Sequence, residues 1–590
     1  MSASYNSSVL RKRMKAKQLI SVLALLSFGS LSIILWCQPR IASKSGLGRA
    51  LSRQRETNME PSKALPATEL YLHPIARLVA DAEAQFTELQ ARQSKSLTEA
   101  VAEYRRRYNI PPPPNFDIWY EFAKARGVQL IDEYDTIFDS LLPFWALEPS
   151  VIRARTREAL GFDNALIGLL IRAGEAVKIE NGAEWQQQAT VGMIENFVQY
   201  LPDMDVAFNI HDEPRVMVPH DDLARLVTRA KDEALPAALG NPSARNKWSE
   251  RPKDMTNGRH IEEVKTTRFN TFAHQPTWTN SRLSCSPDSP ARALNENTVD
   301  NITSYALGDL GFVYNKTAFS DICMSPSLKE TYGFFDRPNA FSIVHDLFPI
   351  FSQSKLSSFQ DILYPSPWYW YGKVSYHESS DMPWPSKKDA LYWRGSTTGG
   401  FSRDGGWRRQ HRQRCVQKMN GLDTAKVLTR PTTPDAGWQL QEVQKTDYKA
   451  LIDVAFSHVG QCDPGDCDTQ REFFTVVEPA AQDAAWASKL LLDVDGNAFS
   501  GRFYAYLKSW SLVFKLAIFR EWHEEWLRPW LHYVPLGFQG DEYVEAVRFF
   551  LQEEEGKVLA ERLALAGREW AGKVLRKEDF EVWFFRVLLE

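Results

Sequence analysis

The stretch Leu391-Tyr-Trp-Arg-Gly-Ser-Thr-Thr-Gly-Gly400 begins as an apolar run and ends in an arginine, three hydroxyl side chains and two glycines. Aromatic and aliphatic residues followed by Gly and Ser are typical of a strand that runs into a tight loop. A guanidinium at that point offers a planar fork of donors to an oxyanion, and glycines let a backbone approach a ligand closely. The stretch therefore predicts a buried strand whose end holds an anionic group.

Similar apolar runs occur on both sides of this stretch. They predict strands at 204–210, 348–351, 389–393, 489–494 and 511–515, and a largely helical end at 543–590. Strands that alternate with helices favour α/β layers with parallel sheets. In open parallel sheets, ligands bind beyond the carboxyl ends of the strands. The polar residues that follow these runs are therefore the first candidates for a site.

Three polar clusters follow predicted strands: Asp212, the loop 394–396, and the segment 496–502. A helix expected from Phe503 would present free N–H groups to a phosphate, with Ser500 as a possible cap and Arg502 adding charge. The plainer alternatives remain open at this point. The segment 496–502 could be an ordinary strand–helix turn, and Asp212 could be a turn residue before Glu-Pro.

The N-terminal region contains an uncharged apolar run at 19–37, LISVLALLSFGSLSIILWC, preceded by five basic residues and no acid between 11 and 17. About 20 apolar residues can span a bilayer as a helix, and flanking positive charge stays cytosolic. The run predicts a signal anchor and a single-pass type II membrane protein with a lumenal body in the Golgi or endoplasmic reticulum. A cleaved signal peptide is the alternative.

Composition and short motifs limit the classes of partner and modification that the sequence predicts. The net charge of −4 in 590 residues gives no basic field for nucleic acid. Asn301 and Asn315 begin glycosylation sequons, which fit a lumenal body. The spacing allows Cys462 to pair with Cys467 and Cys285 with Cys323, while Cys415 stays reduced. No Cys/His group has zinc spacing, so no metal is expected.

Six segments in order resemble the capsule-associated-protein family of glycosyltransferases, which also contains the protein O-glucosyltransferases. They are LPDMDVAFNIHDEP (201–214), FQDILYP (359–365), YWRGS (392–396), DGNAFSGRF (495–503), SLVFK (511–515) and PWLHYVP (529–535). The motif FDIWY (116–120) after a proline run is similar to the fungal, capsule-type members. The resemblance implies two Rossmann-like lobes that face a cleft, the arrangement called GT-B.

The resemblance also implies roles for individual residues. Asp212 matches the general base of an inverting, metal-independent transfer, and the donor is a UDP-sugar co-substrate rather than a cofactor. The implied donor contacts are Arg394, Ser396, Arg412, Asn497, Ala498, Phe499, Ser500, Gly501 and Arg502. Arg412 is chosen among four arginines between 408 and 414. The pair Asp493 and Asp495 is similar to a metal-binding DxD of other transferases but is interpreted as structural.

The expected organisation is a cytosolic tail (1–18), the anchor (19–37), a partly helical stem (38–110), an N-terminal acceptor and base lobe (111–385) with an insertion at 236–340, and a C-terminal nucleotide-sugar lobe with helices (386–590). The predicted function is transfer of xylose or glucose to a hydroxyl of a glycan or glycoprotein. The alternatives are O-glucosylation of a folded protein domain and a non-catalytic carbohydrate-binding member. The aromatic run 368–371 could stack on the acceptor sugar or form a buried cluster.

Overall fold

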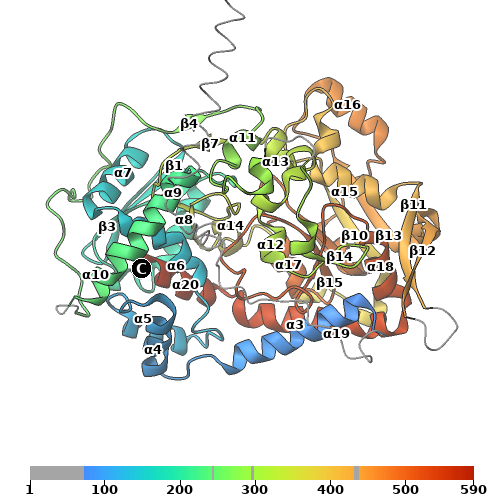
Figure 1. Cartoon of the computed structure of the whole chain (residues 1–590), viewed down its shortest axis with the longest axis horizontal. Coiled ribbons are helices and arrows are strands. Elements are labelled where there is room, and N and C mark those ends of the chain that lie inside the picture. Colours follow the sequence, from blue (N-terminus) through green and yellow to red (C-terminus); the bar gives the residue numbers. More distant parts are fainter. Residues whose placement is uncertain (1–71, 242–244, 294–297, 431–436) are drawn as a thin grey trace, which may run out of the picture. The chain divides into compact units, whose positions relative to one another are not determined.

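The structure is a computed structural model that describes residues 72–241, 245–293, 298–430 and 437–590. All of these residues belong to one contact unit, 55–590. Ten of their strands form two five-stranded sheets, and helices surround both sheets in Figure 1. Three two-stranded ribbons complete the strands of the described part.

The first sheet has the strand order β2-β1-β3-β8-β9. Its strands are β1 (Leu166–Arg172), β2 (Glu175–Glu180), β3 (Met204–Asn209), β8 (Ile350–Ser352) and β9 (Ile362–Leu363). The first three pair antiparallel and the last three parallel. Every residue of β1 is buried, whereas β2 at the edge is largely open. The sheet is therefore mixed, with its polar C-terminal edge at the ends of β3, β8 and β9.

The second sheet is entirely parallel, in the order β13-β10-β14-β15-β16. Its strands are β10 (Lys388–Ser396), β13 (Ile452–His458), β14 (Ser488–Val494), β15 (Leu512–Leu516) and β16 (Val534–Pro535). Leu391 and Trp393 enter one apolar cluster and Tyr392 enters another, so both faces of β10 are covered. Parallel sheets are buried on both faces, which explains the near-continuous apolar runs of this half.

Short strand pairs and helices surround the sheets. The remaining strands are β4 (Asn270–Thr271), β5 (Ala306–Leu307), β6 (Phe312–Val313), β7 (Ser342–Ile343), β11 (Thr424–Thr429) and β12 (Gln439–Gln444). The α-helices are α3 (Pro74–Ala91), α4 (Leu97–Tyr108), α5 (Phe116–Ala125), α6 (Asp135–Leu141), α7 (Pro149–Gly161), α8 (Glu184–Ile194), α9 (His220–Arg229), α10 (Leu235–Leu239), α11 (Trp278–Ser281), α12 (Lys316–Phe319), α13 (Gly333–Asp336), α14 (Pro367–Trp370), α15 (His411–Asn420), α16 (Pro464–Phe473), α17 (Phe503–Lys508), α18 (Tyr543–Gln552), α19 (Glu554–Val574) and α20 (Lys577–Leu589).

The strand predictions in the C-terminal half are confirmed within a few residues, and so is the helical end. The run at 348–351 becomes strand only from Ile350, since Pro349 has no N–H to donate to a ladder. The strands β1, β2 and β13 were not predicted. Periodicity alone cannot separate short apolar runs such as 166–172 from a buried helix segment.

The segment predicted to be a stem is part of the body wherever the structure describes it. Ile75, Leu78 and Val79 of α3 are buried in the apolar cluster of the second sheet, and α3 lies beside α19 in Figure 1. His73 caps α3 and its ring nitrogen bonds the buried Glu545 carboxylate at 2.8 Å. The apolar stripe of α3 recurs at helical spacing, which is why this segment packs instead of standing off as a spacer.

The last helix of the described chain, α20, packs on the first sheet's side of the molecule. Phe585 stacks on Phe197 with a 4.6 Å centroid separation, and Trp119 Nε1 donates to the carbonyl of Val582 at 3.0 Å. In Figure 1 the helix lies among elements of the first half of the chain. The predicted boundary at 385–386 therefore does not separate the packing of the two halves.

The insertion expected at 236–340 carries its own apolar cluster and one disulfide. Cys285 pairs with Cys323, and Cys462 with Cys467, as the spacing suggested, while Cys415 is free and buried. Residues 332–340 of this insertion reach both sheets. Tyr332 Oη donates to Asp495, which follows β14, and the Ala340 N–H donates to Glu213 in the segment after β3, so the insertion contributes directly to the candidate site.

One part of the predicted fold class and of the predicted location is corrected. Over 72–241, 245–293, 298–430 and 437–590, no helix combines the length and apolar character that crossing a bilayer requires. The reason is visible in α19, which has 21 residues but carries charges along its length. The tail 1–18 and the run 19–37 lie outside the described residues. The class is thus mixed α/β without a spanning helix in the described part, and the GT-B assignment stays a prediction.

Candidate functional site

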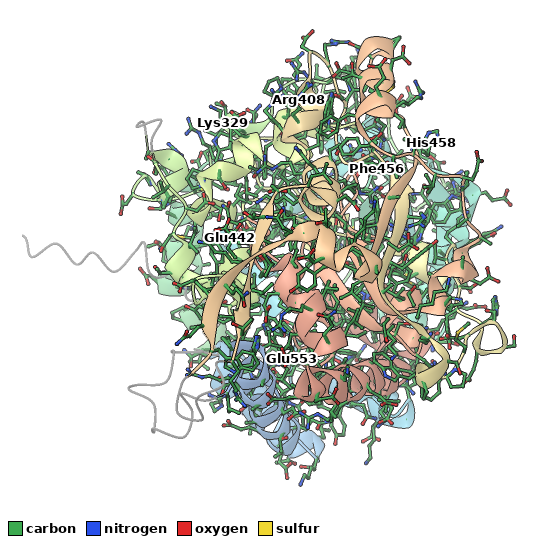
Figure 2. The ribbon with its side chains drawn as sticks, turned by 90° about the vertical axis from the view of Figure 1, so that its right-hand side faces the viewer. Lys329, Arg408, Glu442, Phe456, His458 and Glu553 are labelled. Carbon is green, nitrogen blue, oxygen red and sulfur yellow. A yellow bond between two sulfur atoms is a disulfide. The ribbon has the colours of Figure 1, made fainter. Side chains whose placement is uncertain are left out.

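The loop after β10 is fixed by backbone contacts on both sides. The Thr397 N–H donates to the carbonyl of His458 at 3.1 Å, and the Gly460 N–H donates to Thr397 Oγ1 at 3.0 Å. Figure 2 shows His458 at the end of β13, where this contact is made. On the other side, the Gly399 N–H donates to Asn497 Oδ1 at 3.2 Å. The ends of β13, β10 and β14 are thereby joined.

Close backbone approach explains the two glycines of this loop. Gly399 has φ +111°, and a Cβ there would lie 2.7 Å from His411 Cε1 and 3.0 Å from the carbonyl oxygen of Gly496. Gly400 packs against Gly333 of the insertion, where an added Cβ would lie 2.9 Å from the Gly333 carbonyl oxygen. Neither position has space for a side chain, so the loop can adopt this path only with glycine.

Arg412, in the first turn of α15, is the buried cation of this region, with only 7 % of its surface exposed. Its guanidinium donates to the carbonyls of Asp495 (2.8 Å), Val494 (3.1 Å) and Ser396 (3.1 Å). It also donates to Thr398 Oγ1 at 2.7 Å. Burial lowers its pKa to about 10. All four partners are uncharged groups, whereas buried charges usually pair with an opposite charge.

The other two predicted arginines have different surroundings. Arg394 forms an ion pair with Asp453 at 2.5 Å and donates to the Asp453 carbonyl at 2.8 Å. Arg502 lies over the rings of Trp393 and Tyr506 at 5.8 and 5.7 Å, and it donates to the carbonyl of Arg394. The structure therefore brings Ser396, Arg412 and Asn497 together, and it leaves Arg394 turned toward β13.

The segment between β14 and α17 is a turn built on side-chain contacts. Ser500 does not cap α17; its hydroxyl donates to the carboxylate of Asp493, and Arg502 is the N-cap residue. The helix has only six residues, too few to present a phosphate-binding end. Phe499 and Ala498 are buried, and the carbonyl of Gly501 accepts from Trp368 Nε1 at 3.2 Å. The expected helix-start phosphate site is thus replaced by the turn that was left open as the alternative.

Both acids of the Asp493–Asp495 pair are engaged by protein groups. Asp493 forms an ion pair with Lys515 at 2.9 Å. Asp495 Oδ2 accepts from Tyr332 Oη at 2.9 Å and from the Ile518 N–H at 2.9 Å. Burial raises the pKa of Asp495 to about 6. The structural interpretation of this pair agrees with these contacts.

Asp212 lies three residues beyond Asn209, the last residue of β3, and remains open to solvent. Gln353 Nε2 donates to its Oδ1 at 3.1 Å, and Ser354 Oγ donates to its backbone carbonyl at 3.2 Å. The surrounding protein raises the pKa of its carboxyl to about 6 by desolvation. A carboxylate that is accessible and more basic than usual is suited to accept a proton near neutral pH.

Glu213, the next residue, points inward. Its side chain is 4 % exposed and accepts from the Ala340 N–H at 3.2 Å. Burial raises its pKa to about 8, with a further contribution from the neighbouring Asp212. A carboxyl that stays neutral at pH 7 is a poor proton acceptor, which favours Asp212 over Glu213 as a base.

The helix α14 connects Asp212 to the β14–α17 turn. Ser366, its N-cap residue, donates from Oγ to Gln353 Oε1 at 2.5 Å, and the same Gln353 holds Asp212. From the other end, Tyr369 Oη donates to the carbonyl of Ser500 at 2.8 Å. Figure 1 shows α14 between the elements of the two sheets. The predicted base and the predicted donor segment thus belong to one hydrogen-bonded region.

Several residues of this region were not predicted from the sequence. Tyr332 stacks on His411 with a 4.0 Å centroid separation and an 8° interplanar angle. His411 Nε2 donates to the Asp495 carbonyl at 2.8 Å, and burial lowers its pKa to about 3. Thr398 is the hydroxyl partner of Arg412. The histidine lies one position before a predicted residue, but nothing in the sequence links Tyr332 to this loop.

The two asparagines of the predicted glycosylation sequons differ in exposure. Asn301 is exposed, whereas Asn315 is half-buried and caps α12 through its side-chain oxygen, which accepts from the Ala318 N–H at 3.0 Å.

In the part of the chain that the structure describes, no three His, Cys, Asp or Glu side chains are grouped to hold a metal ion.

Comparison with known proteins indicates which class of enzyme the chain is similar to. No protein-family model matches the chain. The chain is 22 % identical over 291 residues to protein O-glucosyltransferase 1 of Rattus norvegicus, which is 45 % of this chain and 62 % of that protein. It is 26 % identical over 265 residues to the O-glucosyltransferase rumi homolog of Aedes aegypti, covering 41 % and 54 %. For O-glucosyltransferase rumi of Drosophila melanogaster the values are 25 % over 267 residues, 41 % and 53 %. The chain thus spans between half and two thirds of these relatives, and the similarity supports the glycosyltransferase family that contains them.

Proposed function

We propose that the chain is a glycosyltransferase that moves glucose or xylose from a UDP-sugar to a hydroxyl of a glycan or glycoprotein acceptor. The similarity to proteins named O-glucosyltransferases supports the reaction class. The observation that carries the proposal is Arg412, a buried guanidinium with four uncharged partners at the ends of β10 and β14. A diphosphate would add a negatively charged partner to these neutral ones.

The proposed reaction is a single displacement with inversion. The acceptor oxygen attacks the anomeric carbon while the bond from that carbon to the diphosphate oxygen breaks. The hydroxyl proton passes to the Asp212 carboxylate, and UDP leaves with the electron pair of the broken bond. Negative charge develops on the departing diphosphate, and a pre-placed cation such as Arg412 stabilises it. Ser396, Thr398 and Asn497 fix the loop on which this charge would lie.

The relatives' names favour a second acceptor, a hydroxyl of a protein. The same base and the same donor site would serve this reaction, because the attacking group is an alcohol in both cases. The two acceptors are distinguished by the product: a glycan extended by one sugar, or a protein carrying a new O-linked sugar.

The test is a transfer assay on the full chain with labelled UDP-glucose and UDP-xylose, combined with thermal melts in UDP. We expect UDP to raise the melting temperature, because a ligand of the folded state stabilises it. Asp212→Asn should keep this stabilisation and lose transfer about 10²-fold or more. Asp221→Asn, a change at a fully open carboxylate, is the matched control.

Two results would contradict the proposal. Full transfer activity in folded Asp212→Asn would remove the assigned base. Binding of UDP without turnover of either donor, with or without acceptors, would instead indicate a non-catalytic carbohydrate-binding protein.

A further inference from the structure

Three aromatic side chains lie close together, one at the start of α8 and two at α14. Trp185 lies 6.0 Å from Trp368 and 5.9 Å from Tyr371, measured between ring centroids. Tyr371 is 46 % exposed, and the two indoles are half-buried. The Lys373 ammonium lies 4.4 Å from the Trp185 ring centroid and 5.0 Å from that of Tyr371. We call Trp185, Trp368 and Tyr371 the aromatic platform.

Trp368 of the platform is held in place by two contacts. Trp368 Nε1 donates to the Gly501 carbonyl, and a Cβ on Gly501 would lie 2.3 Å from the same nitrogen. The chain folds back after α14, where the Lys373 N–H donates to the Trp368 carbonyl at 3.2 Å. Partly exposed aromatic rings that are fixed in this way can bind a ligand at a small cost in conformational entropy.

The platform lies beside both reacting partners of the proposed transfer. Ser366 caps α14 and reaches Asp212 through Gln353. On α8, Gln186 Nε2 donates to the carbonyl of Ile210 at 3.1 Å, two residues before Asp212. Trp368 touches the β14–α17 turn at Gly501. A ligand on the platform would therefore lie next to the proposed base and to the β14–α17 turn.

We infer that the aromatic platform is the acceptor subsite and that it takes a pyranose ring of a glycan; this inference rests on the proposed function. A pyranose has an apolar C–H face that packs on an aromatic ring and hydroxyls at its rim that suit polar edges. The Tyr371 hydroxyl and the Lys373 ammonium provide such edges. The pyranose would present one hydroxyl to Asp212, which removes its proton during attack on the donor.

A peptide fits this surface less well. Peptides that bind by strand addition use the free backbone groups of a sheet edge. Here the backbone donors of α14 are already used: the N–H groups of Trp370 and Tyr371 donate to the carbonyls of Ser366 and Pro367. The platform offers ring faces and side-chain polar groups, which is the recognition that a sugar needs.

The test measures acceptor KM and kcat for Trp185→Ala and Tyr371→Ala in the full chain, with Trp145→Ala as a control. Trp145 is a comparably exposed tryptophan, 37 %, in the segment after α6. The acceptors are a panel of neutral hexose and pentose oligosaccharides and a folded cysteine-rich protein domain. We expect both platform variants to raise the KM for the best oligosaccharide about tenfold, with kcat changed less.

Two further readings separate this inference from the proposed function. Hydrolysis of the UDP-sugar in the absence of acceptor, and stabilisation by UDP, should match the wild type in both platform variants. If these readings hold but the oligosaccharide KM is unchanged, the platform is not the acceptor subsite. Transfer to the protein domain alone, or to no member of the panel, would overturn the choice of a glycan. Absence of UDP binding and of hydrolysis in the wild type would instead remove the proposed function itself.

Discussion

Asp212 has a pKa of about 6 because protein groups crowd a carboxylate that still reaches solvent. Below this pH the carboxyl is protonated and cannot accept a proton from an acceptor hydroxyl. Its neighbour Glu213 has a pKa near 8 and stays neutral over the same range. At neutral pH the Asp212 carboxyl is therefore mostly ionised, whereas the Glu213 carboxyl is mostly neutral.

A pH profile follows from this difference. Since the base must be ionised, kcat/KM for transfer should rise as pH increases from about 5 and level off above about 7, with an apparent pKa near 6. The measurement is initial rate against pH with the acceptor well below its KM, in buffers of constant ionic strength. A rate that is flat or falls between pH 5 and 7 would be inconsistent with Asp212 as the base.

Arg412 makes four directed hydrogen bonds that only a guanidinium can make together. In Arg412→Lys the charge remains but the fork is lost, so we expect UDP affinity to fall about tenfold and the UDP-induced rise in melting temperature to shrink. Arg408→Lys is the control, because this arginine is exposed and its guanidinium carbon lies 4.1 Å from the Trp407 ring centroid. Figure 2 labels Arg408. Equal UDP binding by the two variants would show that Arg412 has only a structural role.

At the scale of elements, the loop after β10 depends on backbone geometry. Gly399→Ala should destabilise the protein by about 2 to 4 kcal/mol, since it combines positive φ with contacts to His411 and Gly496. Gly308→Ala is a matched control, with φ +70° and no atom within 4 Å of the added Cβ, and should cost only about 1 kcal/mol. Urea unfolding curves give both values. A similar loss in the two variants would mean that crowding at the loop is unimportant.

The sequence predicted the strands that precede several candidate site residues. Asp212, Ser396 and Asn497 lie at or shortly beyond the ends of β3, β10 and β14, and their roles in a site stay predictions. Prediction from the sequence was less accurate where a polar side chain could bond to more than one partner. Ser500 had the character of a helix cap, yet its hydroxyl bonds Asp493, a contact that depends on how β14 and the turn meet in space.

At the scale of the whole molecule, contacts between distant segments decide what local patterns cannot. The α3 segment looked like a spacer because its neighbours are polar, but its apolar stripe packs on the second sheet. Similarly, Tyr332 and Ala340 come from an irregular insertion and reach the site from more than 50 positions away in sequence. No periodicity in the sequence signals such contacts, because they arise from tertiary packing.

The position of α20 makes the first sheet's core depend on the end of the described chain. Phe585 is fully buried, so Phe585→Ala should cost about 3 to 5 kcal/mol. Tryptophan fluorescence and far-ultraviolet circular dichroism should then report one shared, lowered unfolding midpoint. Phe473→Ala, at a 52 % exposed ring on α16, should cost less than about 1 kcal/mol. Two separate transitions in the wild type would contradict this dependence.

The same placement of α20 has a consequence for biosynthesis. The strands of the first sheet leave the ribosome long before residues 577–589 do, and until then Phe197 and Trp119 lack the helix that covers them. Nascent chains should therefore expose an aggregation-prone apolar surface while the second half of the chain is synthesised. Holdase chaperones would recognise stalled chains by this surface, and the first sheet would close only after α20 has left the ribosome.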